Sequence, residues 1–426
     1  SRSMTDVKWI CCQLGAREHY AIPRALLRTG TLDCLLTDAW VPRSSLLARS
    51  LGRGSKLAER FHNELGDARV IGFNSSLILF ETSARVRRLK EWQKIIARNQ
   101  WFQRKVVSVL RSQLRKGAWL PRSFTLSTLN SQLVLCSYSY TALEPFRYAK
   151  SRGWKTMLVQ IDPGPEEERI VAEETARQPE LAGEWHPAPP EYWASWREEC
   201  KLADRIVVNS EWSRTGLTKG GVIGEKLTVI PLAYEELGVG RLADPRLQRK
   251  YPDHFTAERP LRVLFLGLIN LRKGVARLLE AARILRDEPV EFWMVGPVEI
   301  ANAGAITDAG RVKWFGPVTR NQAAGFYRTA DLFILPTLSD GFAITQLEAQ
   351  AHGLPVIASK NCGKVVENGL NGIILDEPSG ACIAHAVRGC IASPDQLEKL
   401  ASASGVRDKF TIEALANQLQ RLGATL

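Results

Sequence analysis

The sequence predicts an α/β protein with two domains, each built around a parallel sheet covered by helices. Its 426 residues are too many for one ordinary domain and enough for two hydrophobic cores. Short apolar strands alternate with glycine-containing turns and helices in both halves, as in Rossmann-like sheets. Residues 235–260 lack apolar periodicity and contain several glycines and prolines. We therefore predict a first domain over residues 4–240, a linker over 241–260, a second domain over 261–405 and a last segment over 406–426.

The first domain begins with a strand, a glycine turn, a helix and a second strand, and the alternation resumes after residue 132. Val7 to Leu14 is interpreted as part of this fold and not as a signal peptide. The apolar pattern predicts strands over residues 9–14, 32–37, 133–138, 156–161 and 205–209, and helices over 19–28, 144–150, 166–174 and 190–203.

The second domain repeats this pattern. Thr319 is the expected cap of a short helix, because it precedes an apolar-periodic segment. The sequence predicts strands over residues 262–266, 289–296, 312–315, 332–335 and 355–358, and helices from 273 and over 321–327, 343–351, 379–391, 395–403 and 411–422.

Composition indicates a globular protein, with 45% hydrophobic and 24% charged residues. No apolar run approaches the length of a membrane-spanning helix. The eight cysteines include no C-x-x-C pair and no spacing suited to zinc, so we expect reduced, mostly buried thiols. These features predict a cytoplasmic protein, with peripheral attachment to the inner face of the membrane as an open alternative.

Basic residues are concentrated in one stretch, within a chain of net charge +12. Residues 85–122 contain twelve Lys or Arg and one acid, Glu91, interleaved with apolar residues. We predict an insertion of one or two amphipathic helices over about 84–122. Such helices can lie on an anionic membrane, or can simply present a solvated cationic surface. Nucleic acid is not an expected partner, because no signature of a nucleic-acid-binding module accompanies the patch.

Two acidic residues flank a helix start in the segment from Asp331 to Leu375. The turn Ser339-Asp340-Gly341 follows the strand over 332–335 and leads into the helix over 343–351. Free amides at the start of this helix would attract an anion such as phosphate. Asp340 and Glu348 are eight positions apart, so both can border one pocket.

The residues of this turn and helix, DGFAITQLEAQAHGLPVIAS, resemble the signature of the retaining family 4 glycosyltransferases, also called glycosyl transferases group 1. The family usually has Glu where this chain has Asp340. The resemblance implies the GT-B fold, in which two Rossmann-like domains face a central cleft. It also implies that the last segment, residues 406–426, packs back on the first domain.

On the donor side, the resemblance implies a nucleoside diphosphate sugar bound to the second domain. Glu348 would accept hydrogen bonds from the ribose, and Asp340 would face the sugar. Arg272 and Lys273 match the family's basic pair that neutralises the diphosphate, although Leu268 replaces a further arginine. Fixed cations there would stabilise charge on the leaving diphosphate. The remaining donor residues would be Gly267, Gly316, Val318 and the turn residues Gly341, Phe342, Ala343, Ile344 and Thr345.

On the acceptor side, Gly15, Arg17, Glu18 and His19 occupy the place of the family's glycine-rich loop, which faces the cleft. Arg17 and His19 could instead cap and solvate the following helix. Asp162 follows the strand over 156–161, where family members often have a histidine close to the transferred sugar. Ser210 would lie at the cleft edge, or would act only as a helix cap.

The resemblance therefore implies a retaining transfer, through same-face attack assisted by the leaving phosphate, to an unidentified glycan, lipid-linked or small-molecule acceptor. The chain has no D-x-D pair, so neither a metal nor another cofactor is expected. Two alternatives remain open. The chain could bind nucleotide sugars without catalysis, or could be an epimerase or phosphorylase of the same fold.

Overall fold

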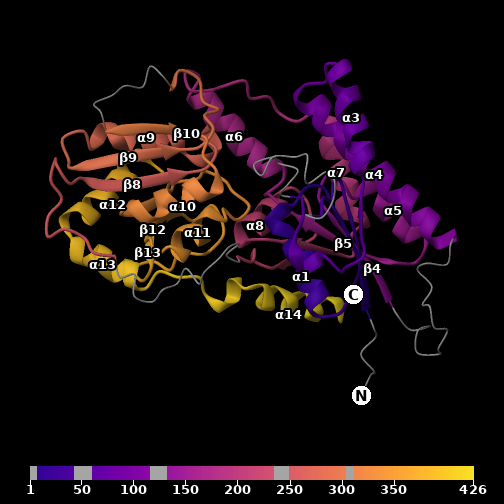
Figure 1. The fold of residues 1–426 in the computed structure, drawn as a ribbon. Helices are drawn as coiled ribbons and strands as arrows, with labels where there is room; N and C mark the ends of the chain where they lie inside the picture. The colour runs from indigo at the N-terminus through magenta and orange to yellow at the C-terminus, as the bar shows by residue number, and fades with distance from the viewer. Residues whose placement is uncertain (1–6, 43–59, 116–131, 235–248, 304–310) are drawn as a thin grey trace.

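The computed structural model describes residues 7–42, 60–115, 132–234, 249–303 and 311–426. Figure 1 shows two α/β domains side by side, each with a parallel sheet between layers of helices. In the described residues the sheets have the strand orders β3-β2-β1-β4-β5-β6-β7 and β10-β9-β8-β11-β12-β13. The predicted pair of Rossmann-like domains is confirmed. The predicted linker lies partly outside the described residues, at 241–248.

All described strand pairs of the first sheet are parallel, and Cys11 pairs with Leu35 on one side and Cys136 on the other. These central strands are buried because helices cover both faces of the sheet. The strands are β1 (Val7–Gln13), β2 (Leu32–Thr37), β3 (Val70–Gly72), β4 (Gln132–Tyr138), β5 (Lys155–Gln160), β6 (Arg205–Val208) and β7 (Leu227–Val229).

Alternation along β1 divides the first core in two, since successive strand residues face opposite sides. Ile10 packs with Phe146 and Trp196 on one face, and Trp9 packs with Tyr20 on the other. The helices of this domain are α1 (Ala21–Arg28), α3 (Asn74–Val86), α4 (Glu91–Arg115), α5 (Leu143–Ser151), α6 (Pro165–Arg177), α7 (Pro190–Leu202) and α8 (Glu211–Lys219).

The segment between β2 and β4 differs most from the prediction. β3 and the first part of α3 were not foreseen, because a three-residue edge strand carries little periodic signal. The predicted basic insertion begins in α3 and continues as the 25-residue α4. Phe102, Val106 and Leu110 of α4 are fully buried in the domain core, so α4 is a covering helix of the sheet. Residues 116–122 of that prediction lie outside the described residues.

In the second domain, the predicted cap Thr319 forms a complete capping box with Gln322 at the start of α10. β13 lies where a loop was expected, as a short edge strand paired with β12. The strands are β8 (Leu261–Leu266), β9 (Val290–Val295), β10 (Val312–Gly316), β11 (Leu332–Leu335), β12 (Val356–Ser359) and β13 (Gly372–Leu375). The helices are α9 (Val275–Ile284), α10 (Arg320–Thr329), α11 (Thr345–Ala351), α12 (Gly380–Ala392) and α13 (Pro394–Ser402).

The last helix, α14 (Ile412–Gly423), returns to the first domain and lies beside α1 (Figure 1). Leu415 and Leu419 join the hydrophobic cluster that contains Trp9 and Tyr20. A Cβ atom on Gly423 would lie 3.0 Å from the Trp9 ring, which shows how closely the helix packs. The chain therefore crosses between the domains twice.

The two domains touch at Gly341, which follows β11. A Cβ atom there would lie 2.1 Å from the carbonyl oxygen of Ile161, at the end of β5. Across the same contact, the hydroxyl of Ser210 donates to the carbonyl of Gly341 over 2.5 Å. The carboxyl ends of strands from both sheets thus meet at one boundary, which is where open α/β sheets bind ligands.

Candidate functional site

Two cavities lie at the domain boundary. The first, which we call the basic cavity, has a volume of about 380 Å³. Its cationic lining residues are Arg17, Arg24, Arg272, Lys273 and Arg320, and its acidic ones are Glu18, Asp340 and Glu348. Phe342, Ala343, Ile344, Thr345 and His19 also line it. Residues from the ends of β1, β8 and β11 therefore converge on one positively charged space.

The basic pair is held in place by a tight turn after β8. The side chain of Asn270 accepts a hydrogen bond from the amide of Lys273, over 3.2 Å. Gly274 follows with a φ of 75°, and a Cβ atom there would lie 1.9 Å from the carbonyl oxygen of Pro336. Only glycine fits this close approach, which sets Arg272 and Lys273 beside the loop that follows β11.

Asp340 is the ionic partner of both cations. Lys273 donates to its carboxylate, and Arg272 Nη1 lies 3.4 Å from Oδ2 of the same group. Burial favours the neutral acid, but the charges of Lys273 and Arg272 outweigh it and hold the pKa of Asp340 below its ordinary value. Asp340 is therefore an anion that positions two cations.

The turn that follows Asp340 is more elaborate than predicted. The amide of Phe342 donates to Asp340 Oδ1 over 3.1 Å, and Ala343 has a φ of 62°. The helix therefore begins at Thr345 and not at Ala343, and the amide of Phe342 is not free for an anion. Within the described residues, no protein acceptor is recorded for the amides of Ala343, Ile344 and Thr345. Those three remain available to a ligand in the cavity.

Glu348 faces the same cavity from α11, and its orientation depends on a residue that sequence reasoning missed. The hydroxyl of Tyr327, on α10, donates to Glu348 Oε2 over 2.8 Å. Burial, together with the neighbouring carboxylate, raises the pKa of Tyr327 well above its ordinary value. His352 stacks on the Tyr327 ring at 5.2 Å. No local pattern marked Tyr327, because its partner lies 21 positions away.

The first domain contributes a strained loop to the cavity. Glu18, His19 and Tyr20 have φ values of 44°, 50° and 61°, so the helix predicted from His19 begins only at Ala21. Across the boundary, His19 Nε2 lies 2.6 Å from Arg320 Nη1. Burial and the charge of Arg320 lower the pKa of His19 to about 4, so the ring is neutral at physiological pH. Glu18, a predicted cleft candidate, also lines the cavity, whereas Arg24 and Arg320 were not predicted to belong to the site.

Seven of the predicted residues do not line the basic cavity, among them Gly341, which forms the domain contact, and Asp162, which lines the second boundary cavity. The amide of Gly15 donates to Asp38 Oδ1 over 2.9 Å, which shapes the loop before Arg17. Ser210 is buried, caps α8 and donates to Gly341, so it joins the domains without facing the cavity. The other three, which are absent from the lining of both boundary cavities, are Gly267, Gly316 and Val318.

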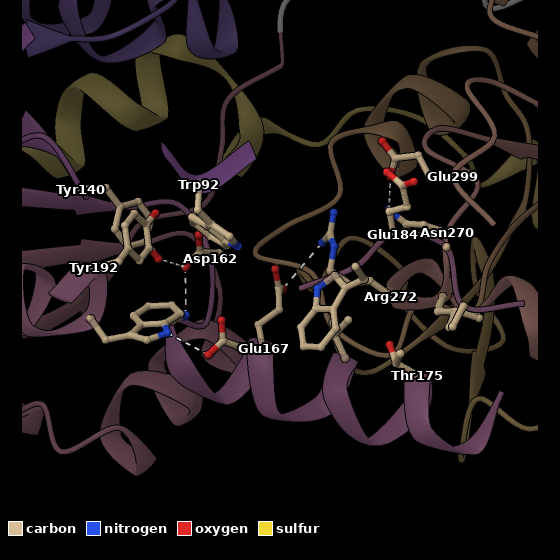
Figure 2. A pocket seen from close by; sticks show the side chains of 18 residues that line it. Trp92, Tyr140, Asp162, Glu167, Thr175, Glu184, Tyr192, Asn270, Arg272 and Glu299 are labelled. Carbon is tan, nitrogen blue, oxygen red and sulfur yellow. Dashed lines mark hydrogen bonds and ion pairs between the residues drawn. The ribbon is translucent and has the colours of Figure 1, made fainter. Parts of the chain in front are cut away.

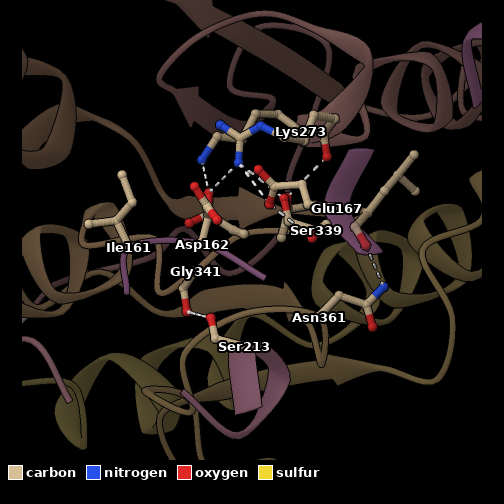
Figure 3. Close-up of polar contacts among 12 residues, drawn as sticks. Ile161, Asp162, Glu167, Ser213, Lys273, Ser339, Gly341 and Asn361 are labelled. Carbon is tan, nitrogen blue, oxygen red and sulfur yellow. Dashed lines mark hydrogen bonds and ion pairs between the residues drawn. The ribbon is translucent and has the colours of Figure 1, made fainter. Parts of the chain in front are cut away.

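The second cavity, which we call the acidic cavity, has a volume of about 640 Å³ and contains the predicted Asp162 (Figure 2). Arg272 lines both cavities. At the domain boundary, Ser339 Oγ donates to Glu167 over 2.9 Å, and Ser213 donates to the carbonyl of Gly341 (Figure 3). Ser339 Oγ also accepts from Trp212 Nε1 over 3.0 Å. Burial raises the pKa of Glu167 to about 7, although Arg272 lies 3.6 Å away.

Among the described residues, no group of three or more His, Cys, Asp or Glu side chains is arranged to hold a metal ion. All eight cysteines are unpaired in the structure, and seven of them are buried.

Comparison with protein families matches residues 260–393 to the glycosyl transferases group 1. This stretch contains Arg272, Lys273, Asp340 and Glu348. The D-inositol 3-phosphate glycosyltransferase of Segniliparus rotundus is 28% identical over 232 residues, 51% of each chain. That of Paenarthrobacter aurescens is 33% identical over 138 residues, 29% of this chain and 32% of the relative. The chain spans about half or less of the length of these relatives.

Solved structures resemble the chain over almost its whole length. Anabaena HepE in complex with UDP-glucose has a TM-score of 0.58 and 14% identity, over 98% of this chain and 100% of HepE. Sucrose-phosphate synthase from Thermosynechococcus elongatus has a TM-score of 0.60 and 17% identity, over 97% and 98%. At this identity the likeness concerns the fold, and the predicted GT-B architecture is confirmed.

Proposed function

We propose that the chain is a retaining glycosyltransferase that uses a nucleoside diphosphate sugar. The GT-B fold and the match of the second domain to the glycosyl transferases group 1 support this proposal. The observation that carries the proposal is the basic cavity. It gathers Arg272, Lys273, Asp340 and Glu348 from the matched stretch against Arg17 and His19 of the first domain. The solved relative in complex with UDP-glucose supports this class of donor.

The diphosphate would bind to Arg272, Lys273 and the amides of Ala343 to Thr345. Cations beside a helix start are unfavourable unless an anion is near, and Asp340 meets that need. As the bond to the sugar breaks, negative charge builds on the leaving diphosphate, and these groups stabilise it. Because side-chain cations supply this stabilisation, we propose that the transfer needs neither a metal ion nor another cofactor.

Glu348 would bind the ribose hydroxyls of the donor. Tyr327 occupies Oε2 of its carboxylate, which leaves Oε1 to accept from the ligand. Asp340 would face the sugar while it holds the basic pair. Since its carboxylate is committed to Lys273, Arg272 and the amide of Phe342, we assign it a positioning role and not that of a nucleophile. Retention would follow from same-face attack, with the leaving phosphate accepting the acceptor proton.

A donor panel tests the proposal. Each nucleotide sugar, beginning with UDP-glucose, is titrated calorimetrically, and release of nucleoside diphosphate is then measured with and without candidate acceptors. Glu348→Gln should weaken donor binding about tenfold or more, because a charge-assisted hydrogen bond is lost. The exposed Glu377→Gln in the same domain is the control. Full activity of Glu348→Gln would contradict the ribose assignment.

The same panel separates the alternatives. Tight donor binding with no hydrolysis and no transfer would support a catalytically silent binding protein. Conversion of the donor to an isomer, with no acceptor present, would support an epimerase. Diphosphate release that depends on an acceptor would support transfer.

We also propose that α3 and the start of α4 contact an anionic membrane. Three aliphatic side chains of α3 are exposed by 54% (Ile78), 71% (Leu79) and 78% (Val86). The exposed Arg85, Arg87, Arg88 and Lys90 adjoin them in the chain. Apolar side chains beside cations suit the interface of an anionic bilayer. Within the described part of the chain, no helix is long and apolar enough to cross a membrane.

A further inference from the structure

The acidic cavity has the opposite electrostatic character to the basic cavity beside it. Among the described residues that line it there is one cation, Arg272, which it shares with the basic cavity. Against this cation stand five acidic residues, Asp162, Glu167, Glu168, Glu184 and Glu299. Figure 2 shows Asp162 beside Tyr192 and Trp92, Glu167 between Asp162 and Arg272, and Glu184 and Glu299 together beyond Arg272. A second anion would therefore meet mainly repulsion here.

Several of these carboxylates keep an oxygen for a ligand. Tyr140 and Gln160 donate to Asp162 Oδ1 over 2.6 and 2.8 Å, and the amide of Gly164 donates to the same oxygen over 2.9 Å. Asn270 donates to Glu299 Oε2 over 2.8 Å. Among the described residues, none donates a hydrogen bond to Asp162 Oδ2, to Glu299 Oε1 or to the exposed carboxylate of Glu184. The first two groups are thus oriented by the protein while one oxygen remains free.

Aromatic rings surround Asp162 at one end of the cavity (Figure 2), and ring contacts and hydrogen bonds hold them in place. Tyr140 stacks on Tyr192 at 4.8 Å, and Trp92 lies 4.8 Å from Tyr192. Trp92 Nε1 donates to the carbonyl of His186 over 3.0 Å, and Trp193 Nε1 donates to Glu168 over 2.8 Å. Rigid aromatic faces favour the C–H face of a sugar ring and also favour cations.

We propose that the acidic cavity binds the acceptor, and that the acceptor is a polyhydroxylated ring with an ammonium group and no phosphate. This inference rests on the proposed transferase function. Its donor would occupy the basic cavity, and Arg272 would lie at the junction of the two. In the transfer, the acceptor hydroxyl oxygen bonds to the anomeric carbon as the bond from that carbon to the diphosphate breaks. The hydroxyl proton leaves with the diphosphate.

We infer the ammonium group of the acceptor from the charge of the acidic cavity and not from the volume of the cavity. A volume of about 640 Å³ would admit many small sugars. A neutral sugar would leave the negative charge of Asp162, Glu184 and Glu299 uncompensated, whereas an ammonium group pairs with it. The relatives are named for an inositol 3-phosphate, and among the described lining residues a phosphate in this cavity would meet one cation, the shared Arg272.

Calorimetry with matched disaccharides tests the proposal near neutral pH, with UDP present. Three disaccharides serve as probes: the β-1,4-linked glucosamine disaccharide, its N-acetylated form and cellobiose. A second comparison, of glucosamine 6-phosphate with glucosamine, tests the effect of a phosphate group. We expect the amine to bind about tenfold more tightly than the acetylated and neutral forms, and the phosphate to weaken binding. Equal affinities, or tighter binding of the phosphate, would overturn the proposal.

Variants locate the effect. Asp162→Asn and Glu299→Gln should each weaken binding of the amine about three- to tenfold and leave the acetylated form nearly unchanged. Glu184→Gln adds an exposed position where misfolding is not expected, and Glu377→Gln is the control outside both cavities. Amine binding that is unaffected in all three cavity variants would contradict the location.

Donor binding is measured in the same samples. If UDP-glucose or another nucleotide sugar binds and Glu348→Gln weakens it, while the amine preference is absent, only this inference fails. If no nucleotide sugar binds at all, the proposed function itself fails.

Discussion

The hydroxyl of Tyr327 donates a hydrogen bond of 2.8 Å to the carboxylate of Glu348. This contact joins α10 to α11 and fixes the carboxylate that we assign to the ribose. The pKa of Tyr327 is raised, so the phenol keeps its proton and remains a donor over the physiological range.

We predict that Tyr327→Phe weakens donor binding about three- to tenfold and lowers the free energy of unfolding by about 1 kcal/mol, because the ring packing stays and one hydrogen bond is lost. Calorimetric titration of the donor and urea unfolding measure the two effects. The control is Tyr251→Phe, which removes a hydroxyl bonded to the carbonyl of Asp331 in the same domain. A Tyr327→Phe protein with unchanged donor affinity would show that Glu348 needs no such support.

Asp340 gives a prediction about pH. Its folded-state pKa lies below the ordinary value, so the ion pairs stabilise the fold above that ordinary value and are lost as the pH falls through the folded-state pKa. Asp340→Asn should therefore lower the free energy of unfolding by about 2 kcal/mol at neutral pH, and the difference should shrink below about pH 4. Urea unfolding at several pH values tests this. A difference that is constant with pH would contradict the ionic role of Asp340.

The close contact at Gly341 predicts that adding a side chain at this position would push the two domains apart. A Cβ atom would lie 2.1 Å from the carbonyl oxygen of Ile161, so Gly341→Ala must move backbone. We expect an increased radius of gyration in small-angle X-ray scattering and at least about a tenfold loss of transfer, because the site is assembled from both domains. Gly389→Ala, on α12 with open space around it, is the matched control. A compact, fully active Gly341→Ala protein would exclude this contact as a determinant of the site.

The membrane proposal predicts that the cations and the exposed apolar side chains both contribute to binding of anionic vesicles. Replacing Arg85, Arg87, Arg88 and Lys90 with Gln should strongly reduce sedimentation with anionic vesicles. The binding free energy should weaken by about 1 kcal/mol for each cation removed. The double variant Leu79→Ser, Val86→Ser should weaken vesicle binding, but the remaining binding should depend on salt as in the unchanged protein. Since these side chains are exposed, the melting temperature should change little. Unchanged vesicle binding in the charge variant would rule out this surface as the attachment site.

Much of the fold could be predicted because its signals are local. The strand over 332–335, the cap at Thr319 and the glycine turns after strands each depend on neighbours a few positions away. The basic pair and the two acids of the second domain were recognisable for the same reason, as they belong to short motifs. The three-residue β3 and the left-handed residues Glu18 to Tyr20 were missed, because tertiary contacts and not propensity stabilise them.

The sequence by itself determined two Rossmann-like domains and a cluster of charged residues at strand ends, for which we propose anion binding. Only the tertiary structure decided that Tyr327 orients Glu348, that His19 meets Arg320 and that Asp162 and Glu348 face different cavities. His19 and Arg320 are 301 positions apart in the chain. Such contacts depend on how two finished sheets pack at their carboxyl ends, and no periodicity within either sheet carries that information.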